Sequence, residues 1–232
     1  CETWPSYSTT KEKYVKEFGG DGSVEYFAPV GVVGQSGYFV PRYMVEGDGA
    51  VAPDLKTYEQ LNQYKDLFKT LETGDKGRLI GCPVAAWECK DAERVAGLGL
   101  EYEVVELGSE TAHFAEIKAA YDRKEPFLAY AWAPHWLFAQ LDLVEVGLPA
   151  HTDETWPVSD WPEDVTYNYG RPSLNEDHPE VVQLIKNFNL SNDEQAPLIL
   201  AIDIEGKDME DVVTAWLEDN KAKWQAWLPG TN

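Results

Sequence analysis

Apolar residues recur with two different periods between residues 53 and 150. Short apolar runs predict strands over residues 79–81, 102–107 and 127–132. Between them, apolar residues at helical spacing predict helices over residues 58–71, 91–98 and 110–123. Helices that alternate with strands are typical of an α/β fold with a largely parallel sheet.

The two ends of the chain are patterned differently. A short helix is predicted over residues 10–18 and strands over 23–33 and 37–41. Residues 151–175 are rich in proline and carboxylates and show no period, which indicates a long surface excursion. Helices are then predicted over 179–188, 193–204 and 209–227, the second of them capped by Ser191.

Composition narrows the classes of partner. The chain has 232 residues, 44% of them hydrophobic, and a formal net charge of −22. That charge disfavours nucleic acid and anionic membrane surfaces, and it attracts cations to any cleft as well as keeping the protein soluble. No run of 18 apolar residues occurs, so no membrane insertion is predicted.

Cysteines and an acidic segment leave alternatives open. Cys82 and Cys89 flank a short loop, and they form either a disulfide in an oxidising compartment or two free thiols. The state of Cys1 is left open as well. Asp153 and Glu154 begin a group of carboxylates that either holds a structural Ca²⁺ or forms a solvated loop.

Three tryptophans suggest the chemistry. Trp132 stands at the end of a predicted strand, Trp87 follows another, and the turn Trp4-Pro5 stands near the start of the chain. Open α/β sheets bind ligands at strand ends, and tryptophan faces attract organic cations. We therefore hypothesise that these rings converge on one organic cation; the alternative is that they are ordinary core residues.

Several blocks of the chain match a known family in order. The segment Trp132-Ala-Pro-His-Trp136 resembles the Gly-Trp-Thr-Pro-His-Trp-Met-Phe pattern of substrate-binding proteins of the glycine betaine/choline/proline betaine ABC-importer family. Further blocks resemble that family's N-terminal Trp-Leu-Pro turn, a Val-Pro-x-Tyr strand, a Lys-Glu-Pro turn, an Asp-His-Pro-Glu-Val helix start and the C-terminal helix; they lie at residues 1–5, 37–43, 121–126, 176–181 and 212–227.

The resemblance implies the architecture of a type II periplasmic binding protein: two α/β lobes that close on a ligand caged by tryptophans. The flexible residues 47–49 then separate a first lobe, residues 1–46 and 151–232, from a second lobe, residues 47–150. Trp4 and Trp132 would be cage walls, with Pro5 orienting the first, while His135 and Trp136 would pack as support. The N-terminal part of the first lobe, with one cage tryptophan, is expected to be absent from this chain.

The family also implies partners and a location. We expect a monomer outside the cytoplasm, periplasmic or otherwise extracytoplasmic, that needs no cofactor and delivers its ligand to the membrane permease of an ABC importer. An enzyme acting on methylated amines is the competing class, but no nucleophile–base pair or cofactor motif is present. A ligand-sensing domain on the same fold is a third interpretation.

The departures from the family pattern concern the ligand. Betaine binders hold a carboxylate through a glycine-rich loop and a histidine after the Trp-Leu-Pro turn. Here the loop carries Trp87 and Glu88 instead of glycines, and no histidine follows Pro5. An acid would repel a carboxylate, so the sequence predicts a member that binds trimethylamine N-oxide. Choline, glycine betaine and carnitine, taken up as osmoprotectants or nutrients, are the alternatives, and Glu88 could equally be a solvated loop acid.

Overall fold

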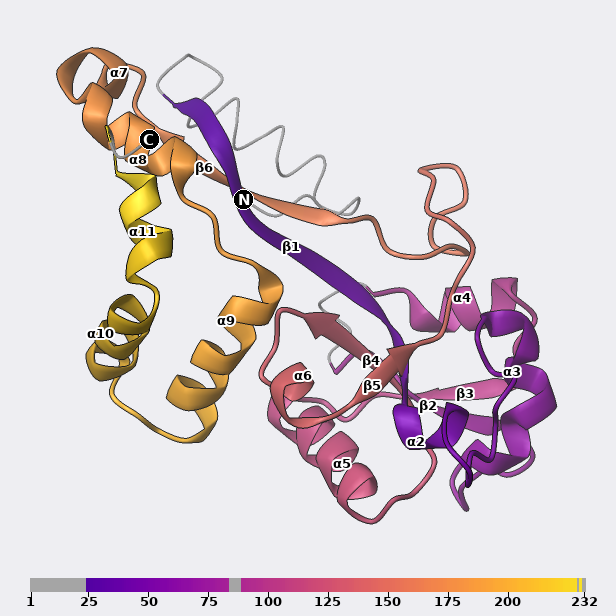
Figure 1. Ribbon diagram of the computed structural model, residues 1–232. Helices are drawn as coiled ribbons and strands as arrows, with labels where there is room; N and C mark the ends of the chain where they lie inside the picture. Colours follow the sequence, from indigo (N-terminus) through magenta and orange to yellow (C-terminus); the bar gives the residue numbers. More distant parts are fainter. Residues whose placement is uncertain (1–23, 84–88, 229, 231–232) are drawn as a thin grey trace. The chain divides into compact units, whose positions relative to one another are not determined.

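The computed structural model describes residues 24–83, 89–228 and 230 (Figure 1). Four residues assigned to the ligand site, Trp4, Pro5, Trp87 and Glu88, lie outside these ranges, as does the helix predicted over residues 10–18. In the part of the chain that is described, no helix combines the length and the apolar composition that a membrane crossing needs.

The chain divides into two compact units. Unit 1 comprises Cys1–Gln35, Ala133–Ala139 and Glu163–Asn232, and unit 2 comprises Ser36–Trp132 and Gln140–Pro162. The boundaries therefore fall at residues 35/36, 132/133, 139/140 and 162/163, whereas the sequence suggested 46/47 and 150/151 and placed residues 133–139 in the second lobe. The reason is that residues 39–41 pair with β5 of unit 2, and that Ser159 and Trp161 contact Arg94 of unit 2.

Unit 2 contains most of a mixed sheet whose strand order is β3-β2-β4-β1-β5. Strand β2 runs parallel to β3 and to β4, whereas β5 is antiparallel to β1. The elements of this unit and the strands that continue from it are β1 (Glu25–Pro41), α2 (Arg42–Val45), α3 (Tyr58–Tyr64), the 3-10 helix η3 (Lys65–Phe68), β2 (Gly77–Ile80), α4 (Asp91–Gly97), β3 (Tyr102–Val105), α5 (Glu110–Asp122), β4 (Leu128–Ala133) and β5 (Leu143–Glu145).

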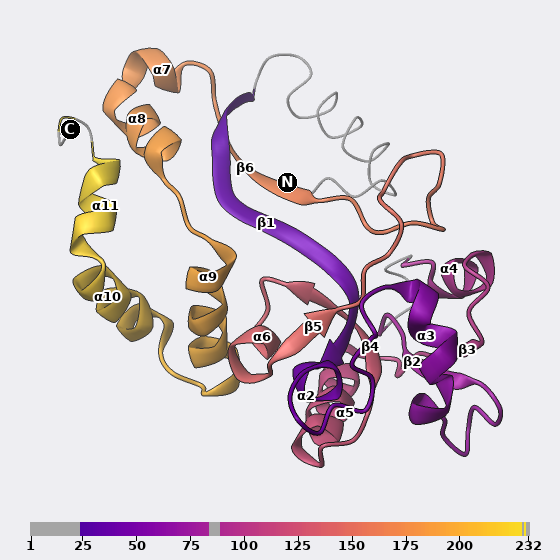
Figure 2. The same cartoon turned by 45° about the vertical axis from the view of Figure 1, so that its right-hand side comes forward.

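Helices α4 and α5 cover opposite faces of this sheet (Figure 2). Along the strand order of the sheet, the connection from β2 to β3 runs in one direction, and the connection from β3 to β4 runs in the opposite direction, past β2. Parallel crossovers are right-handed, so the two connecting helices must lie on opposite faces. The core between the layers includes Leu79, Ile117 and Leu128, all of them fully buried. Ser109 caps α5 by accepting a hydrogen bond from the Ala112 amide at 3.2 Å.

Unit 1 combines a two-stranded ribbon with a run of helices. The first half of β1 pairs antiparallel with β6 (Asp164–Gly170), and the Asn192 side chain donates to the Val33 carbonyl and accepts from its amide at 2.6 and 3.0 Å. The helices that lie partly or wholly in this unit are α6 (Leu137–Gln140), α7 (Leu174–Asp177), α8 (Pro179–Asn187), α9 (Asn192–Ile199), the π-helix η5 (Leu200–Ile204), α10 (Met209–Asp219) and α11 (Lys221–Trp227).

Three sequence predictions need correction. Residues 23–33 and 37–41 belong to one long strand, because Gly34 packs against Asp164 and lets β1 continue without a turn. Residues 151–175 are not wholly irregular, since β6 lies within them. The C-terminal helix is interrupted at Asn220, whose side chain donates to the Trp216 carbonyl at 2.8 Å.

Candidate functional site

The carboxyl ends of β2 and β4 lie side by side in unit 2. Leu79 pairs with Leu128 and Ile80 with Ala129. Strand β2 is followed by the segment that begins at Gly81, and β4 reaches Trp132 three residues beyond Ala129. Open α/β sheets bind their ligands outside the carboxyl ends of such strands. This edge of the sheet is therefore the candidate site.

The Trp132 ring is half-buried at this edge and is held from two elements. It meets the Phe114 ring of α5 edge-on, with 5.0 Å between the centroids, and the Tyr130 ring at 5.8 Å. Tyr130 and Trp132 are two residues apart on one strand, so their side chains share a face of the sheet. The ring is thus packed against aromatic neighbours while part of its surface stays accessible.

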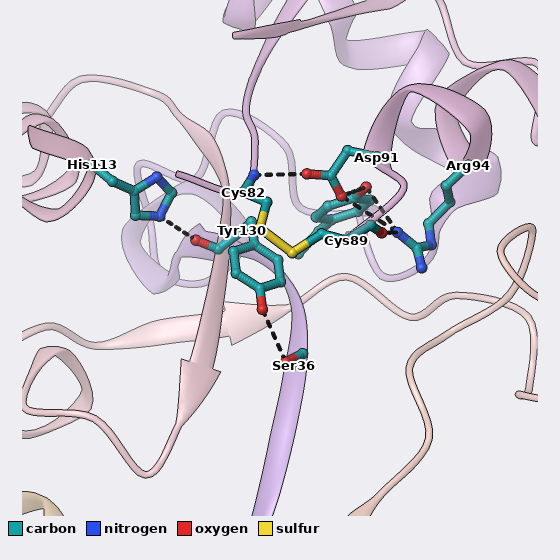
Figure 3. The surroundings of a disulfide bond; sticks show 8 residues. Ser36, Cys82, Cys89, Asp91, Arg94, His113 and Tyr130 are labelled. Atoms are coloured by element: carbon teal, nitrogen blue, oxygen red, sulfur yellow. Dashed lines mark hydrogen bonds and ion pairs between the residues drawn. A yellow bond between two sulfur atoms is a disulfide. The ribbon is translucent and has the colours of Figure 1, made fainter. Parts of the chain in front are cut away.

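His113 fixes α5 to the end of β4. Its side chain is fully buried, and its Nε2 lies 2.8 Å from the Tyr130 carbonyl oxygen, to which it donates (Figure 3). Burial lowers the pKa of His113 to about 4, because a charged imidazolium would lose its hydration, even though the backbone hydrogen bond favours the protonated form. The imidazole is therefore neutral at pH 7, and it orients the strand two residues before Trp132.

Cys82 and Cys89 form a disulfide in the structure, with their Cα atoms 6.1 Å apart. The bridge closes the segment after β2, which contains Trp87 and Glu88 in the sequence. Gly81 allows close packing against both β3 and α4, because a Cβ at that position would lie 2.5 Å from the Val104 side chain and 3.1 Å from the Asp91 carboxylate. A glycine is therefore required where the strand ends.

A buried ion pair joins the two cysteines to α4 (Figure 3). The Asp91 carboxylate accepts from the Cys82 amide at 2.7 Å and from the Tyr38 hydroxyl at 2.6 Å. Arg94, which is fully buried, lies 3.4 Å from Asp91 and donates to the Cys89 carbonyl at 3.0 Å. Burial raises the pKa of Asp91, while its hydrogen bonds and Arg94 lower it.

Aromatic rings enclose the same guanidinium. Its carbon lies 3.6 Å from the centroid of Trp161, 5.1 Å from that of Trp156 and 5.8 Å from that of Tyr38. The Arg94 Nε donates to the Ser159 carbonyl at 2.8 Å. Cation–π contacts of this kind gain strength when water is excluded. Unit 2 thus contains an aromatic cage that its own arginine occupies.

The sequence predictions for the site have different outcomes. Trp132 lies at the expected strand end, but its role as a cage wall stays a prediction, as do the roles of the four residues outside the described ranges. His135 is buried and its Nδ1 accepts from the Leu137 amide at 3.2 Å, while Trp136 is half-buried beside it. Their supporting role also stays a prediction.

The calcium hypothesis finds no support in the described residues, where no group of three or more histidine, cysteine or acidic side chains is placed to hold a metal ion. The Asp153 side chain is 93% exposed, and its carboxylate lies 3.6 Å from His151 Nε2. Glu154 lies in the same exposed turn.

Sequence reasoning missed the Asp91–Arg94 pair and its tryptophan neighbours. An acid and a base three residues apart on a predicted helix normally form a surface pair, and nothing in the spacing distinguishes a buried one. Trp156 and Trp161 lie in the aperiodic segment, where no pattern predicts which side chains turn inward. The density of tryptophan between residues 156 and 161 is the one signal that could have indicated a packed core there.

Comparison with known proteins identifies the family. The sequence model of one protein family, the substrate binding domain of ABC-type glycine betaine transport systems, matches residues 3–219. The chain belongs to this family. The family consists of substrate-binding domains rather than enzymes, as predicted.

Individual relatives are distant. The glycine betaine/carnitine transport binding protein GbuC of Listeria monocytogenes is 25% identical over 126 residues, which are 54% of this chain and 39% of that protein. The chain therefore spans much less than two thirds of this curated relative's length.

Solved structures share the fold. A glycine betaine/L-proline-binding protein (ProX) of Borrelia burgdorferi has a TM-score of 0.59 at 20% identity, over 99% of this chain and 77% of its own. The closed lactococcal OpuAC with glycine betaine has a TM-score of 0.57 at 19% identity, over 98% and 78%. A choline-binding protein in complex with choline has the same TM-score and identity, over 99% and 73%.

Proposed function

We propose that this chain is the solute-binding component of an ABC importer and captures a small methylated amine, with trimethylamine N-oxide as the preferred solute. The observation that carries the proposal is the half-buried Trp132 at the carboxyl edge of the parallel sheet, on the strand that pairs with β2, after which the Cys82–Cys89 disulfide follows. Membership of the family supports the solute-binding role. On this proposal the partner is a membrane permease, and the binding protein acts as a monomer outside the cytoplasm.

The ligands named for the relatives support an aromatic cage. Glycine betaine, carnitine and choline all carry a trimethylammonium group and differ at their other end. A quaternary nitrogen has no N–H to donate, so it is bound through its diffuse charge and its methyl surface. Each tryptophan face contributes roughly 0.5–2 kcal/mol to such a contact. Trp132 supplies one such face, and Trp4 and Trp87 are proposed to supply others.

The choice of trimethylamine N-oxide rests on the segment between the two cysteines. Glu88 in that segment would repel the carboxylate of glycine betaine or carnitine, and the bulk of Trp87 favours a shorter solute. Choline is the second candidate, because its full positive charge and hydroxyl donor both suit an ionised carboxylate. The disulfide agrees with a location outside the cytoplasm, where such bonds persist.

Calorimetry with four solutes tests both the solute-binding role and the identity of the preferred solute. Trimethylamine N-oxide, choline, glycine betaine and carnitine are titrated into the protein and into a Glu88→Gln variant. We expect trimethylamine N-oxide to bind tightest to the wild type, with a dissociation constant near micromolar, on the order of −8 kcal/mol. Tightest binding of glycine betaine would contradict the assignment of the solute, and no binding of any of the four would contradict the solute-binding role. Unchanged selectivity in Glu88→Gln would exclude Glu88 from the site.

A further inference from the structure

Unit 2 contains a pocket of about 230 Å³ near the amino ends of β2 and β4, away from the edge that holds Trp132. We propose that this pocket binds a small organic carboxylate, whose charged end pairs with Arg78 and whose apolar part packs against Phe68 and Phe127. The inference goes beyond the proposed function and does not rest on it, because Trp132 does not line this pocket.

Arg78 interrupts the apolar pattern of β2, which reads Gly77-Arg78-Leu79-Ile80. Strands of parallel sheets are covered on both faces and are nearly continuous apolar runs. Side chains two residues apart on a strand share a face, so Arg78 lies on the same face as the buried Ile80. Its ion pair with Glu116 shows that this is the face covered by α5. A charged side chain placed between two layers is costly unless its polar atoms find partners.

The guanidinium of Arg78 lacks acceptors. Its Nη1 atom lies 2.6 Å from the Glu116 carboxylate, whereas its buried Nε has no hydrogen-bond partner among the described residues. A guanidinium carries five N–H donors in a planar fork that matches the two oxygens of a carboxylate. The group missing from this pocket is therefore an acceptor, which favours a ligand that brings carboxylate oxygens.

The charges that line the pocket favour the same sign of ligand. The side chains of Arg78 and Lys69 are 17% and 30% exposed, and those of Glu116 and Glu125 are 35% and 52% exposed. Solvent screens exposed charges more than buried ones. The two cations therefore act more strongly inside the pocket than the two acids, even though Lys69 also pairs with Asp66 at the surface.

The rest of the lining suits a short apolar body. Phe68, Ile80 and Phe127 line the pocket and are buried. Ala120 follows Glu116 by about one turn of α5, and its small side chain leaves room beside the ion pair. The volume equals that of about eight water molecules at ~30 Å³ each, so a ligand of roughly that many non-hydrogen atoms fits. Benzoate and isovalerate are carboxylates of this size.

Titration of the whole chain with benzoate and with isovalerate, followed by ¹H–¹⁵N correlation NMR, tests the proposal. Arginine Nε–H groups give their own signals, so that of Arg78 reports directly on the pocket. We expect both acids to shift this signal, with a dissociation constant of roughly 1 mM or below for ligands this small. Benzamide and benzylamine have nearly the same size as benzoate but no negative charge, and they should leave the signal unchanged.

Two substitutions should change the affinity for benzoate in opposite directions. Arg78→Gln should weaken binding at least roughly tenfold, because a charge-assisted hydrogen bond is lost, and Glu116→Gln should strengthen it about twofold or more, because a competing carboxylate is neutralised. Arg42→Gln is the matched control. Arg42 pairs with Glu46 and Asp142 and does not line the pocket, and its loss changes the net charge as Arg78→Gln does. Its affinity should equal that of the wild type.

Three results would each overturn the proposal: an Arg78 signal that millimolar benzoate does not move, an equal shift with benzylamine or benzamide, or losses of affinity in Arg42→Gln as large as in Arg78→Gln. If Arg78→Gln does not fold, the wild-type titration and the direction of the Glu116→Gln effect decide. Trp132→Ala should bind benzoate as tightly as the wild type does, so this proposal and the proposed function can fail independently.

Discussion

Two clusters of aromatic side chains in unit 2 differ in what they surround and in how far they are buried. Trp156, Trp161 and Tyr38 surround Arg94, whose side chain is fully buried. Trp132 packs against Phe114 and Tyr130 at the sheet edge and stays half-buried. The first group is sealed around a cation that belongs to the protein. The second presents part of a ring where α/β sheets bind ligands, so similar chemistry serves stability in one place and, under the proposed function, recognition in the other.

The two clusters also differ in the charge of the groups beside them. Asp91 lies 3.4 Å from the Arg94 guanidinium and compensates its charge inside the protein. Near Trp132, His113 packs against Phe114 and Tyr130, and burial lowers its pKa to about 4, so it is neutral at pH 7. A neutral imidazole orients the strand without introducing a charge that would compete with a cationic or dipolar solute. The predictions below separate these two roles.

The largest effect is expected from Arg94→Met. This substitution leaves the Asp91 carboxylate buried without its partner, and such losses cost about 3–5 kcal/mol in unfolding free energy. Urea unfolding, followed by tryptophan fluorescence, measures the change. Arg78→Met is the control, because the Arg78 side chain is 17% exposed and that of its partner Glu116 is 35% exposed. Equal destabilisation by the two substitutions would show that the buried Asp91–Arg94 pair contributes no more to the unfolding free energy than the partly exposed Arg78–Glu116 pair.

Acidification should act through His113. Its pKa is lowered from 6.5 to about 4 by burial, so between these values the unfolded state binds more protons than the folded state. Stability is therefore complete above about pH 6.5 and is lost as the pH falls toward 4, by roughly 3 kcal/mol in total. Unfolding measured from pH 7.5 to 4.5 should show a shallower decline in His113→Gln than in wild type.

His178→Gln provides the comparison for that experiment, because the His178 side chain is 55% exposed. Its decline with pH should follow that of the wild type. If His113→Gln follows the wild type as well, the buried imidazole does not couple stability to pH.

Removal of the disulfide should have a smaller effect. Cys82 and Cys89 are seven positions apart, and closing so short a loop contributes about 2 kcal/mol through the entropy of the unfolded chain. The double variant Cys82→Ser/Cys89→Ser should be destabilised by that amount in urea, while Asp91 and Arg94 still hold the Cys82 amide and the Cys89 carbonyl. Reduction of the wild type with dithiothreitol should give the same shift. A loss as large as that of Arg94→Met would mean that the disulfide contributes as much to stability as the buried ion pair.

Much of the fold was predictable because its elements carry their own local signals. The helices predicted over residues 91–98 and 110–123 and the strand between them appear within two residues of their predicted ends, since apolar periodicity and, for α5, the Ser109 cap define them. Strand β6 was missed, although Val165, Tyr167 and Tyr169 alternate as in a strand, because the preceding prolines and carboxylates dominate that segment. The continuity of β1 depends on pairing with β5 and β6, which no local pattern reveals.

The position of Trp132 at a strand end was predictable, because an apolar run precedes it; its role in the site stays a prediction. The burial of Arg94 was not predictable, because it depends on Trp156 and Trp161, which are more than sixty positions away in the chain. Long-range packing of that kind decides whether an arginine is a surface residue or a buried one, and the helical pattern around residue 94 is the same in both cases.

The most direct test of the central claim is calorimetric titration of trimethylamine N-oxide into wild type and Trp132→Ala, with Trp132→Phe as the variant that keeps an aromatic face. Loss of the cation–π contact should weaken binding at least roughly tenfold in Trp132→Ala and by less in Trp132→Phe. Circular dichroism establishes that each variant is folded before titration. An affinity in folded Trp132→Ala equal to that of the wild type would remove Trp132 from the solute site and contradict the assignment of the sheet edge.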